Sequence, residues 1–258
     1  MLNKVEGIVL RTTDYGETHK IITVYTEELG KVALMARGAK KPKSRFAAAC
    51  QPYVQAVFVF NQSRGMGSLS SADIVNSFRY IRSDLMKTAY ASYAVELLDK
   101  LTEDREPNPP LYDLLSDIFL RMNDEGEEEI LIRIFETKML YTTGAAPVLH
   151  ACVNCGNMEE PLRFSLSHAG VLCRDCIHLD KYPLPVGPQA VKLMRLFQQL
   201  NLARLGKISV KPETKKQLQL LLEAYYDEYV GVYVKAKRFL KQMEDLENRQ
   251  VDKDSDFT

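Results

Sequence analysis

The feature that most limits what this chain can fold into is a group of four cysteines placed in two close pairs. Two residues separate Cys152 from Cys155 and Cys173 from Cys176, and 17 residues separate the pairs. This spacing is typical of a four-thiolate zinc site, because each C-x-x-C turn directs two sulfurs at one tetrahedral ion, roughly 2.3 Å away. Four thiolates complete the coordination shell and leave no position for water. The spacing therefore predicts one structural zinc ion per chain, not a catalytic one.

The residues around the cysteines leave other interpretations open. Gly156 follows the first pair and would let the turn adopt a left-handed conformation that directs backbone N–H groups at the thiolates. The pairs could instead be redox-active or free buried thiols, and His150, His168 or His178 could replace one ligand. The fifth cysteine, Cys50, follows three alanines, and we expect it to be a small core residue.

Length and composition indicate an ordinary globular protein with an uneven distribution of charge. A chain of 258 residues suggests about two domains, and 46% apolar with 26% charged residues is enough to form a real core. The net charge is zero, but residues 1–80 hold 11 Lys/Arg against 6 Asp/Glu, whereas residues 81–150 hold 7 against 14. Residues 151–258 are close to balanced, with 16 against 14. The first part would therefore attract a polyanion and the second would not.

No targeting or membrane signal is visible. The start of the chain lacks a basic head followed by an apolar stretch, no apolar run approaches 18 residues, and neither end carries a lipidation motif. We therefore expect a cytoplasmic protein with reduced thiols.

The first 80 residues have the pattern of a small β domain. Short runs of β-branched and aromatic residues alternate with turn residues, and no long helical period interrupts them. Five short strands favour a small barrel or sandwich, and five is the strand count of an OB-fold. The expected strands are residues 5–10, 19–26, 31–36, 53–60 and 67–75.

The pattern changes to helical near residue 81. Apolar residues then recur every fourth position, which predicts a helix of about five turns with Ser83 as its N-cap. We expect an α+β protein with a barrel domain over residues 1–80. A mostly helical domain should follow over residues 81–258, with the finger inserted at about 150–180. The other expected helices are residues 111–122, 124–141, 188–200 and 212–243, followed by a polar tail from residue 244 that should fray.

A cluster of basic residues lies between the third and fourth expected strands. Such a loop on a small barrel suits a nucleic-acid backbone, with charge following the phosphates and aromatic rings stacking on bases. A solvated loop and buried aromatic residues are the competing interpretations. The candidate DNA contacts are Arg11, Lys20, Lys31, Arg37, Lys40, Lys41, Lys43 and Arg45, and the candidate stacking residues are Tyr15, Tyr25, Phe46, Tyr53 and Phe58.

Sequence motifs of an enzyme are absent. The chain has no G-x-x-x-x-G-K-[ST] loop, no G-x-G-x-x-G, no G-x-S-x-G and no H-E-x-x-H. The acidic run at residues 127–129 fits a helix start, where acids are favourable, better than a catalytic dyad. We therefore predict a protein that is not an enzyme.

Several stretches resemble the RecO family of bacterial recombination mediators. The resemblance covers nearly the whole chain except the tail, and the junction between the helices and the finger is its most specific part. Ala236 stands where members of the family often carry serine. The matching positions are residues 6–10, 15–17, 30–31, 36–42 and 51–53, then Phe135, Glu136, Leu140, Gly144, Pro147, Leu149, Cys152, Cys155, Gly156, Phe164, Gly170, Cys173, Cys176 and residues 237–240.

The resemblance implies an N-terminal OB-fold, a helical remainder that carries the zinc finger, and a function. Members of the family bind single- and double-stranded DNA and anneal complementary strands. With RecR, they help load RecA onto strands coated by single-strand-binding protein, as part of the RecF pathway. The acidic tail of single-strand-binding protein docks on their helical region. The resemblance thus implies a bacterial, nucleoid-associated protein that acts on RecA only indirectly.

Two other classes compete with this interpretation. A zinc-ribbon RNA-binding or translation-associated factor on an OB-type barrel would prefer structured RNA, through contacts with 2′-hydroxyls. A metal-dependent hydrolase is disfavoured, because four cysteine ligands leave the metal no open position.

Overall fold

The structure is a computed structural model in which the chain divides into two compact units. The first unit comprises Met1–Gly126 and Val234–Thr258, and the second comprises Glu127–Tyr233. The division of the chain near residue 80 into a barrel domain and a helical domain stays a prediction. The structure describes the whole chain except residues 63–64, 125–126, 160, 203–204, 207 and 256–258, and the side chains up to residue 246.

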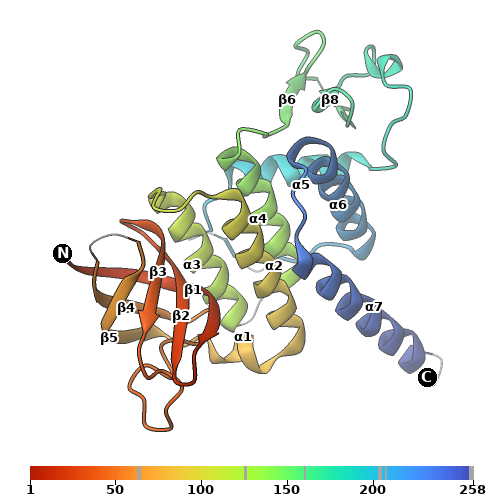
Figure 1. Ribbon diagram of the computed structural model, residues 1–258. Coiled ribbons are helices and arrows are strands. Elements are labelled where there is room, and N and C mark those ends of the chain that lie inside the picture. Colours follow the sequence, from red (N-terminus) through yellow and green to blue (C-terminus); the bar gives the residue numbers. More distant parts are fainter. Residues whose placement is uncertain (63–64, 125–126, 160, 203–204, 207, 256–258) are drawn as a thin grey trace. The chain divides into compact units, whose positions relative to one another are not determined.

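The first unit begins with a closed five-stranded barrel (Figure 1). The strand order around the barrel is β1-β2-β3-β5-β4, and β4 closes it by pairing antiparallel with β1. Four of the five pairings are antiparallel, and only β3 and β5 run parallel. The expected five-stranded, OB-like barrel is confirmed. The strands are β1 Leu2–Tyr15, β2 His19–Thr26, β3 Gly30–Ala36, β4 Gln55–Asn61 and β5 Gly67–Asn76.

Alternation along the strands fills the barrel. Ile22 lies opposite Leu34, and Val24 lies opposite Val32, with all four side chains in the core. Because successive strand residues point to opposite faces, the residues between them lie on the outer face. β1 is much longer than the expected strand over residues 5–10, because it continues past a register shift between Val9 and Arg11.

Four helices complete the first unit: α1 Arg79–Ser83, α2 Leu85–Leu101, α3 Pro109–Asp124 and α7 Lys235–Ser255. The expected N-cap Ser83 is wrong by one residue, because the short helix α1 takes up Ser83 and ends there. Asp84 caps α2 instead, and its carboxylate accepts the backbone N–H of Lys87 at 2.9 Å.

The expected continuous helix over residues 212–243 is also wrong. Helix α6, Pro212–Tyr225, passes into a π-helical turn, η3, Tyr226–Val230, which ends at Gly231. Gly231 has a φ of 63°, a left-handed conformation that glycine adopts without steric cost. The next helix, α7, starts at Lys235 and continues to Ser255, beyond residue 244, where we expected fraying.

Within its described residues, the second unit contains three α-helices, the π-helical turn η3 and the cysteine finger. Helices α4 Glu128–Thr142 and α5 Pro188–Gln199 pack on each other and on α6. Pro188 lies in the first turn of α5, as expected. The backbone N–H groups of a helix's first turn have no partner within the helix, so the N–H that proline lacks is not missed. The finger contains strands β6 Val148–Cys152, β7 Arg163–Ser165 and β8 Gly170–Leu172, in the order β6-β8-β7, and the 3₁₀ turn η1 Ile177–Leu179. Among the described residues, no helix is both long enough and apolar enough to cross a membrane.

Candidate nucleic-acid interface and metal centre

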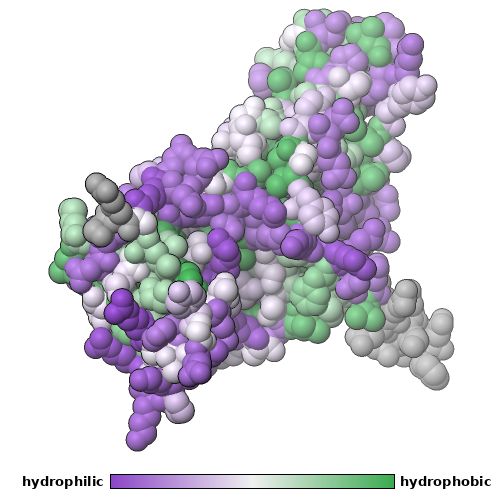
Figure 2. Space-filling view, viewed as in Figure 1, coloured by the Kyte–Doolittle hydropathy of each residue, from purple (hydrophilic) through white to green (hydrophobic). Residues whose placement is uncertain are grey.

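The candidate nucleic-acid interface is the segment of residues 37–45, here called the basic loop, which follows β3. It carries five exposed cations: Arg37, Lys40, Lys41, Lys43 and Arg45. Ala39 within the loop and Phe46 just after it are buried and belong to the core cluster of the barrel. In Figure 1 the segment is the orange loop that extends beyond the strands, and Figure 2 shows mostly hydrophilic side chains over it.

Hydrogen bonds fix the shape of the basic loop. The backbone N–H of Gly38 donates to Nδ1 of His19 at 2.9 Å, and that of Lys40 donates to the carbonyl of Thr18 at 3.0 Å. At the other end, the guanidinium of Arg45 donates to the carbonyl of Ser70 at 2.9 Å. Its centre also lies 4.8 Å from the centroid of the Phe46 ring. The exposed cations therefore stand on a backbone that is held at both ends.

One acidic residue moderates this positive surface. Asp14, near the end of β1, pairs with Lys40 at 2.8 Å and with Lys20 at 3.9 Å. The hydrogen bond from Lys40, followed by the charges of Lys40 and Lys20, lowers the pKa of Asp14. Lys20 and Lys40 are thus partly neutralised in the free protein, whereas no ion pair within the described residues involves Lys41 or Lys43.

Two of the candidate DNA-binding residues form ion pairs with acidic residues of α2 and of the segment after it. Lys31 is only 7% exposed and pairs with Asp99 at 3.1 Å and with Asp104 at 3.6 Å. Its charge joins the barrel to α2 and the segment after it, and its contact with phosphate stays a prediction. Arg11 is largely exposed but also pairs with Asp99, at 3.4 Å.

Most of the candidate stacking residues prove to be core. Tyr25 and Phe58 are fully buried, and Phe46 and Tyr53 are nearly so. The hydroxyl of Tyr53 forms a 2.7 Å hydrogen bond with the hydroxyl of Ser92 on α2. Only Tyr15, at 53% exposure, remains accessible for stacking.

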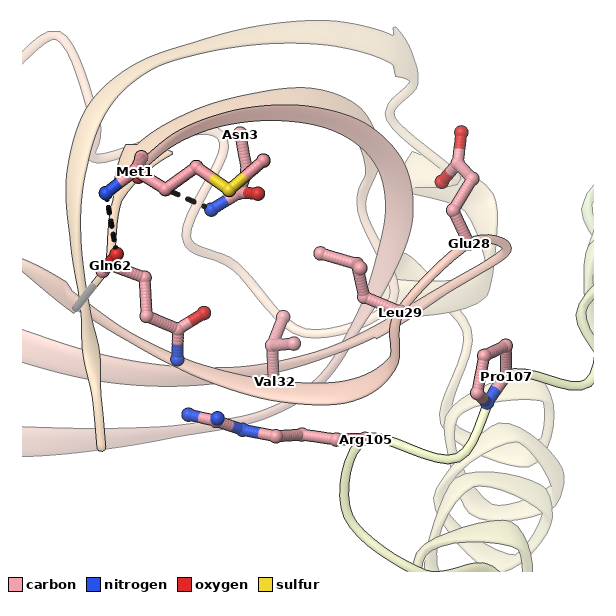
Figure 3. A pocket seen from close by; sticks show the side chains of 8 residues that line it. All are labelled: Met1, Asn3, Glu28, Leu29, Val32, Gln62, Arg105 and Pro107. Atoms are coloured by element: carbon pink, nitrogen blue, oxygen red, sulfur yellow. Dashed lines mark hydrogen bonds between the residues drawn. The ribbon is translucent and has the colours of Figure 1, made fainter. Parts of the chain in front are cut away.

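A small pocket lies at the other end of β2 (Figure 3). Its volume is about 280 Å³, and Arg105, with a φ of 61°, forms one wall. The N-terminal ammonium of Met1 donates to the carbonyl of Gln62 at 2.8 Å across its rim. No sequence motif marks this pocket. It is lined by Met1, Asn3, Glu28, Leu29, Val32, Gln62, Arg105 and Pro107.

The four cysteines converge in the second unit. Their sulfurs all lie within 4.8 Å of one another, and Sγ of Cys155 lies 3.6 Å from Sγ of Cys173. A tetrahedron with metal–sulfur bonds of 2.3 Å has edges of about 3.8 Å, so the Cys155–Cys173 separation matches such an edge and the group is compact enough to hold a metal ion. The cysteines are not joined by disulfides. No histidine takes part: Nδ1 of His168 hydrogen-bonds instead with the hydroxyl of Ser165 at 2.9 Å.

The backbone forms a tight turn at each pair. The N–H of Gly156 donates to the carbonyl of Cys152 at 2.8 Å, and the N–H of Cys176 donates to that of Cys173 at 3.1 Å. Gly156 has a φ of 76°, so the expected left-handed turn is confirmed. The side-chain amide of Asn154 also donates to Sγ of Cys176 at 3.3 Å.

The close packing of the sulfurs gives the cysteine thiols different pKa values. Burial raises the pKa of the Cys152 thiol, but backbone N–H groups of Cys173, Cys155 and Asn154 outweigh it and bring that pKa to about 6. At Cys176 the Asn154 hydrogen bond lowers the pKa, yet burial and the other thiols raise it to about 12. A bound cation favours the ionised form of every thiol, so four thiols this close together have the chemistry of a metal site.

Comparison with known proteins covers both halves of the chain. The family described as "Recombination protein O N terminal" matches residues 1–78, and "Recombination protein O C terminal" matches residues 82–238. The chain is 48% identical over 246 residues to the DNA repair protein RecO of Bacillus pumilus, covering 95% of this chain and 96% of that protein. It is 46% identical over 246 residues to the RecO protein of Halalkalibacterium halodurans (95% and 97%). The RecO protein of Bacillus subtilis is 44% identical over 248 residues (96% and 97%).

Proposed function

This chain belongs to the RecO family of recombination and DNA repair proteins, and we propose that it holds DNA strands on the basic loop and promotes their pairing without catalysis. The observation that carries the proposal is the exposed row of cations on a backbone anchored at both ends. A charged, shaped surface binds the phosphate backbone without reading sequence. Annealing and mediation require no bond chemistry, which agrees with the absence of catalytic motifs in the sequence.

The finer roles rest on the family resemblance. We propose that the chain binds single- and double-stranded DNA and anneals complementary strands. With RecR, it would help load RecA onto strands coated by single-strand-binding protein. The acidic tail of that protein would dock on the helical region, and the protein would act in the bacterial cytoplasm, at the nucleoid.

The metal has a structural role in this proposal. We propose that Cys152, Cys155, Cys173 and Cys176 hold one zinc ion per chain. Four thiolates complete its shell, so the ion would supply folding energy to the finger and take no part in DNA chemistry.

The decisive experiment changes the charge of the basic loop. The variant Lys40→Ala/Lys41→Ala/Lys43→Ala should bind single-stranded DNA more weakly at every sequence. The slope of log affinity against log salt concentration should become shallower by up to about 2, because each of three lost phosphate contacts accounts for about 0.7. A matched control, Lys181→Ala/Lys192→Ala/Lys216→Ala, removes the same charge from exposed positions of the second unit. It should bind like the unmodified protein.

Pairing is measured with complementary strands coated by the cognate single-strand-binding protein. The chain should accelerate pairing without ATP, and the loop variant should lose most of that acceleration. Unchanged affinity and salt slope in the loop variant would show that the loop is merely solvated. Tighter binding to folded RNA than to DNA, with no effect on coated strands, would favour the RNA-binding alternative.

A further inference from the structure

The first two turns of α7 carry a charge pattern that helix stability does not explain. Lys235, Lys237, Arg238 and Lys241 all lie there, and the first acidic residue of the helix is Glu244. The N-terminus of a helix bears a positive partial charge, so cations near it destabilise the helix. These residues are therefore better explained by something that they bind.

Three of these cations form one exposed row. Lys235, Arg238 and Lys241 are spaced three residues apart and are all exposed, whereas Leu240 is buried on the side of α7 that packs against α2. The row is about 9 Å long, given a rise of 1.5 Å per residue. None of the three side chains has an ion-pair partner among the described residues, in contrast to Lys20, Lys31 and Lys40. Figure 2 shows mostly hydrophilic side chains over these turns.

An aromatic ring stands beside the row. Phe239 is 36% exposed, whereas the next residue, Leu240, is buried. Cations next to an accessible ring are the combination with which proteins hold single strands, by phosphate contacts and base stacking. We call Lys235, Arg238, Phe239 and Lys241 the α7 cation face.

The α7 cation face is joined firmly to the helix that packs beside the barrel. The carboxylate of Glu96 on α2 accepts the backbone N–H groups of Lys235 at 2.9 Å and Ala236 at 2.8 Å. Three residues further along α2, Asp99 pairs with Arg11 of β1 and with Lys31 of β3. The barrel and the start of α7 are thus fixed to the same end of α2, within one compact unit.

We propose that the α7 cation face is a second binding surface for single-stranded DNA, which holds one strand while the basic loop holds the other. This inference rests on the proposed function and deepens it. Pairing needs two strands to be held close together, and one surface saturated by one strand cannot bring in its complement. The face is positive and carries a stacking ring, so its chemistry fits a nucleic-acid strand better than an acidic peptide, which would need no ring.

The test uses the full chain with Lys235→Gln/Arg238→Gln/Lys241→Gln. This variant keeps Glu96 as the cap of α7 and removes charges that oppose the helix dipole, so its melting temperature should equal or exceed that of the unmodified protein. The variant Lys181→Gln/Lys192→Gln/Lys216→Gln is the control for the loss of three charges. Two non-complementary oligonucleotides of roughly ten nucleotides, within the usual range for one small barrel, carry different fluorophores. Sedimentation velocity then counts the strands bound to each chain.

We expect two strands per chain for the unmodified protein and the control, and one for the α7 variant. Annealing of complementary strands should slow by about tenfold in the α7 variant, because three phosphate contacts are lost. Its affinity for the first strand should change by less than about twofold. Loss of the second strand together with slow annealing would support the inference.

Other results separate the two proposals. One strand per chain in the unmodified protein, or two in the α7 variant with normal annealing, would overturn the second surface and leave the basic loop standing. An α7 variant that binds both strands but loses binding of poly-glutamate would assign the face to an acidic protein, and would also overturn the inference. No binding of any oligonucleotide by the unmodified protein would overturn both proposals.

Discussion

The basic loop and the cysteine finger are both surface segments with little regular structure, yet different forces hold them. The basic loop is anchored from inside, because Ala39 and Phe46 lie in the barrel core while the cations point outward. The end of the finger is closed by four sulfurs, of which Cys155 is exposed. A loop built on a core keeps its shape without any ligand. A loop closed by four thiols that hold a metal ion would lose that closure when the ion is removed.

This difference separates the roles of the two segments. The basic loop is held by core packing and hydrogen bonds that involve no metal, so changes to the finger should reach DNA binding only through stability of the second unit. The following predictions test that separation.

Removal of the metal should have the largest effect, and it should be confined to the second unit. Structural zinc contributes roughly 10–16 kcal/mol of apparent binding free energy in isolated fingers. Chelation, or Cys152→Ser, should therefore abolish protection from hydrogen exchange around residues 148–180, while the barrel over residues 2–76 stays protected. The metal should be retained at neutral pH and lost as the pH falls, because protons compete for the thiolates.

Cys50→Ala is the matched control for this experiment. Cys50 is a buried thiol of the barrel, and burial raises its pKa to about 11. The variant should keep one equivalent of zinc, measured by elemental analysis. The distinction between the two segments would be lost if the finger were equally protected from hydrogen exchange with and without metal. It would also be lost if the barrel and the finger lost protection together.

Phe46→Ala should weaken DNA binding although it changes no charge. The ring is 6% exposed and packs in the barrel core, so its loss should cost about 3–5 kcal/mol of unfolding free energy. The basic loop loses its internal anchor at the same time, and the affinity for single-stranded DNA should fall. The melting temperature and a titration with labelled oligonucleotide measure the two effects.

Phe46→Leu provides the comparison, because it keeps an apolar anchor of similar size. It should recover most of the affinity. If Phe46→Ala lowers the melting temperature but leaves DNA binding intact at a temperature where the protein is folded, the loop does not need its core anchor.

Asp14→Asn should have the smallest effect, and in the opposite direction. It removes the carboxylate that pairs with Lys40 and Lys20, so DNA binding should tighten by about two- to fivefold and the salt slope should steepen. Because Lys40 lowers the pKa of Asp14, the carboxylate is ionised at neutral pH. The difference from the unmodified protein should persist at neutral pH and vanish as the pH falls through that lowered pKa.

Glu17→Gln is a suitable control, since Glu17 is an exposed acid on the turn after β1 with no ion pair among the described residues. Binding by the Asp14 variant that equals that of the unmodified protein at low salt would mean that Lys40 does not contact phosphate.

Local patterns in the sequence were sufficient for much of the fold. The runs at residues 19–26 and 31–36 are short and mostly apolar between turn residues, and they form β2 and β3 almost to the residue. The spacing of the cysteines likewise predicted that all four sulfurs would meet, because a C-x-x-C turn is a local structure. Its ion stays a prediction, as do the DNA contacts.

The sequence was least informative where distant residues decide the outcome. Lys31 pairs with Asp99, which is 68 residues away and cannot be identified from periodicity. The break between α6 and α7 depends on Gly231, which is tolerable within a helix by propensity alone. Ala236 lacks the serine side chain common in the family, yet Glu96, 140 residues earlier, accepts its backbone N–H.

Helix α7 is the last element of the chain and packs against the much earlier helix α2, and this sets the order of folding during synthesis. Residues 127–233 leave the ribosome before α7, so the second unit can fold while α2 still lacks its neighbour. The contacts of Glu96 with residues 235–236 and of Tyr90 with Glu244 form only after those parts of α7 have emerged. A chain interrupted after residue 233 would keep its finger but leave one side of α2 uncovered. Exposed apolar surface of that kind is what cellular proteases recognise, so incomplete copies should be degraded rather than compete for DNA.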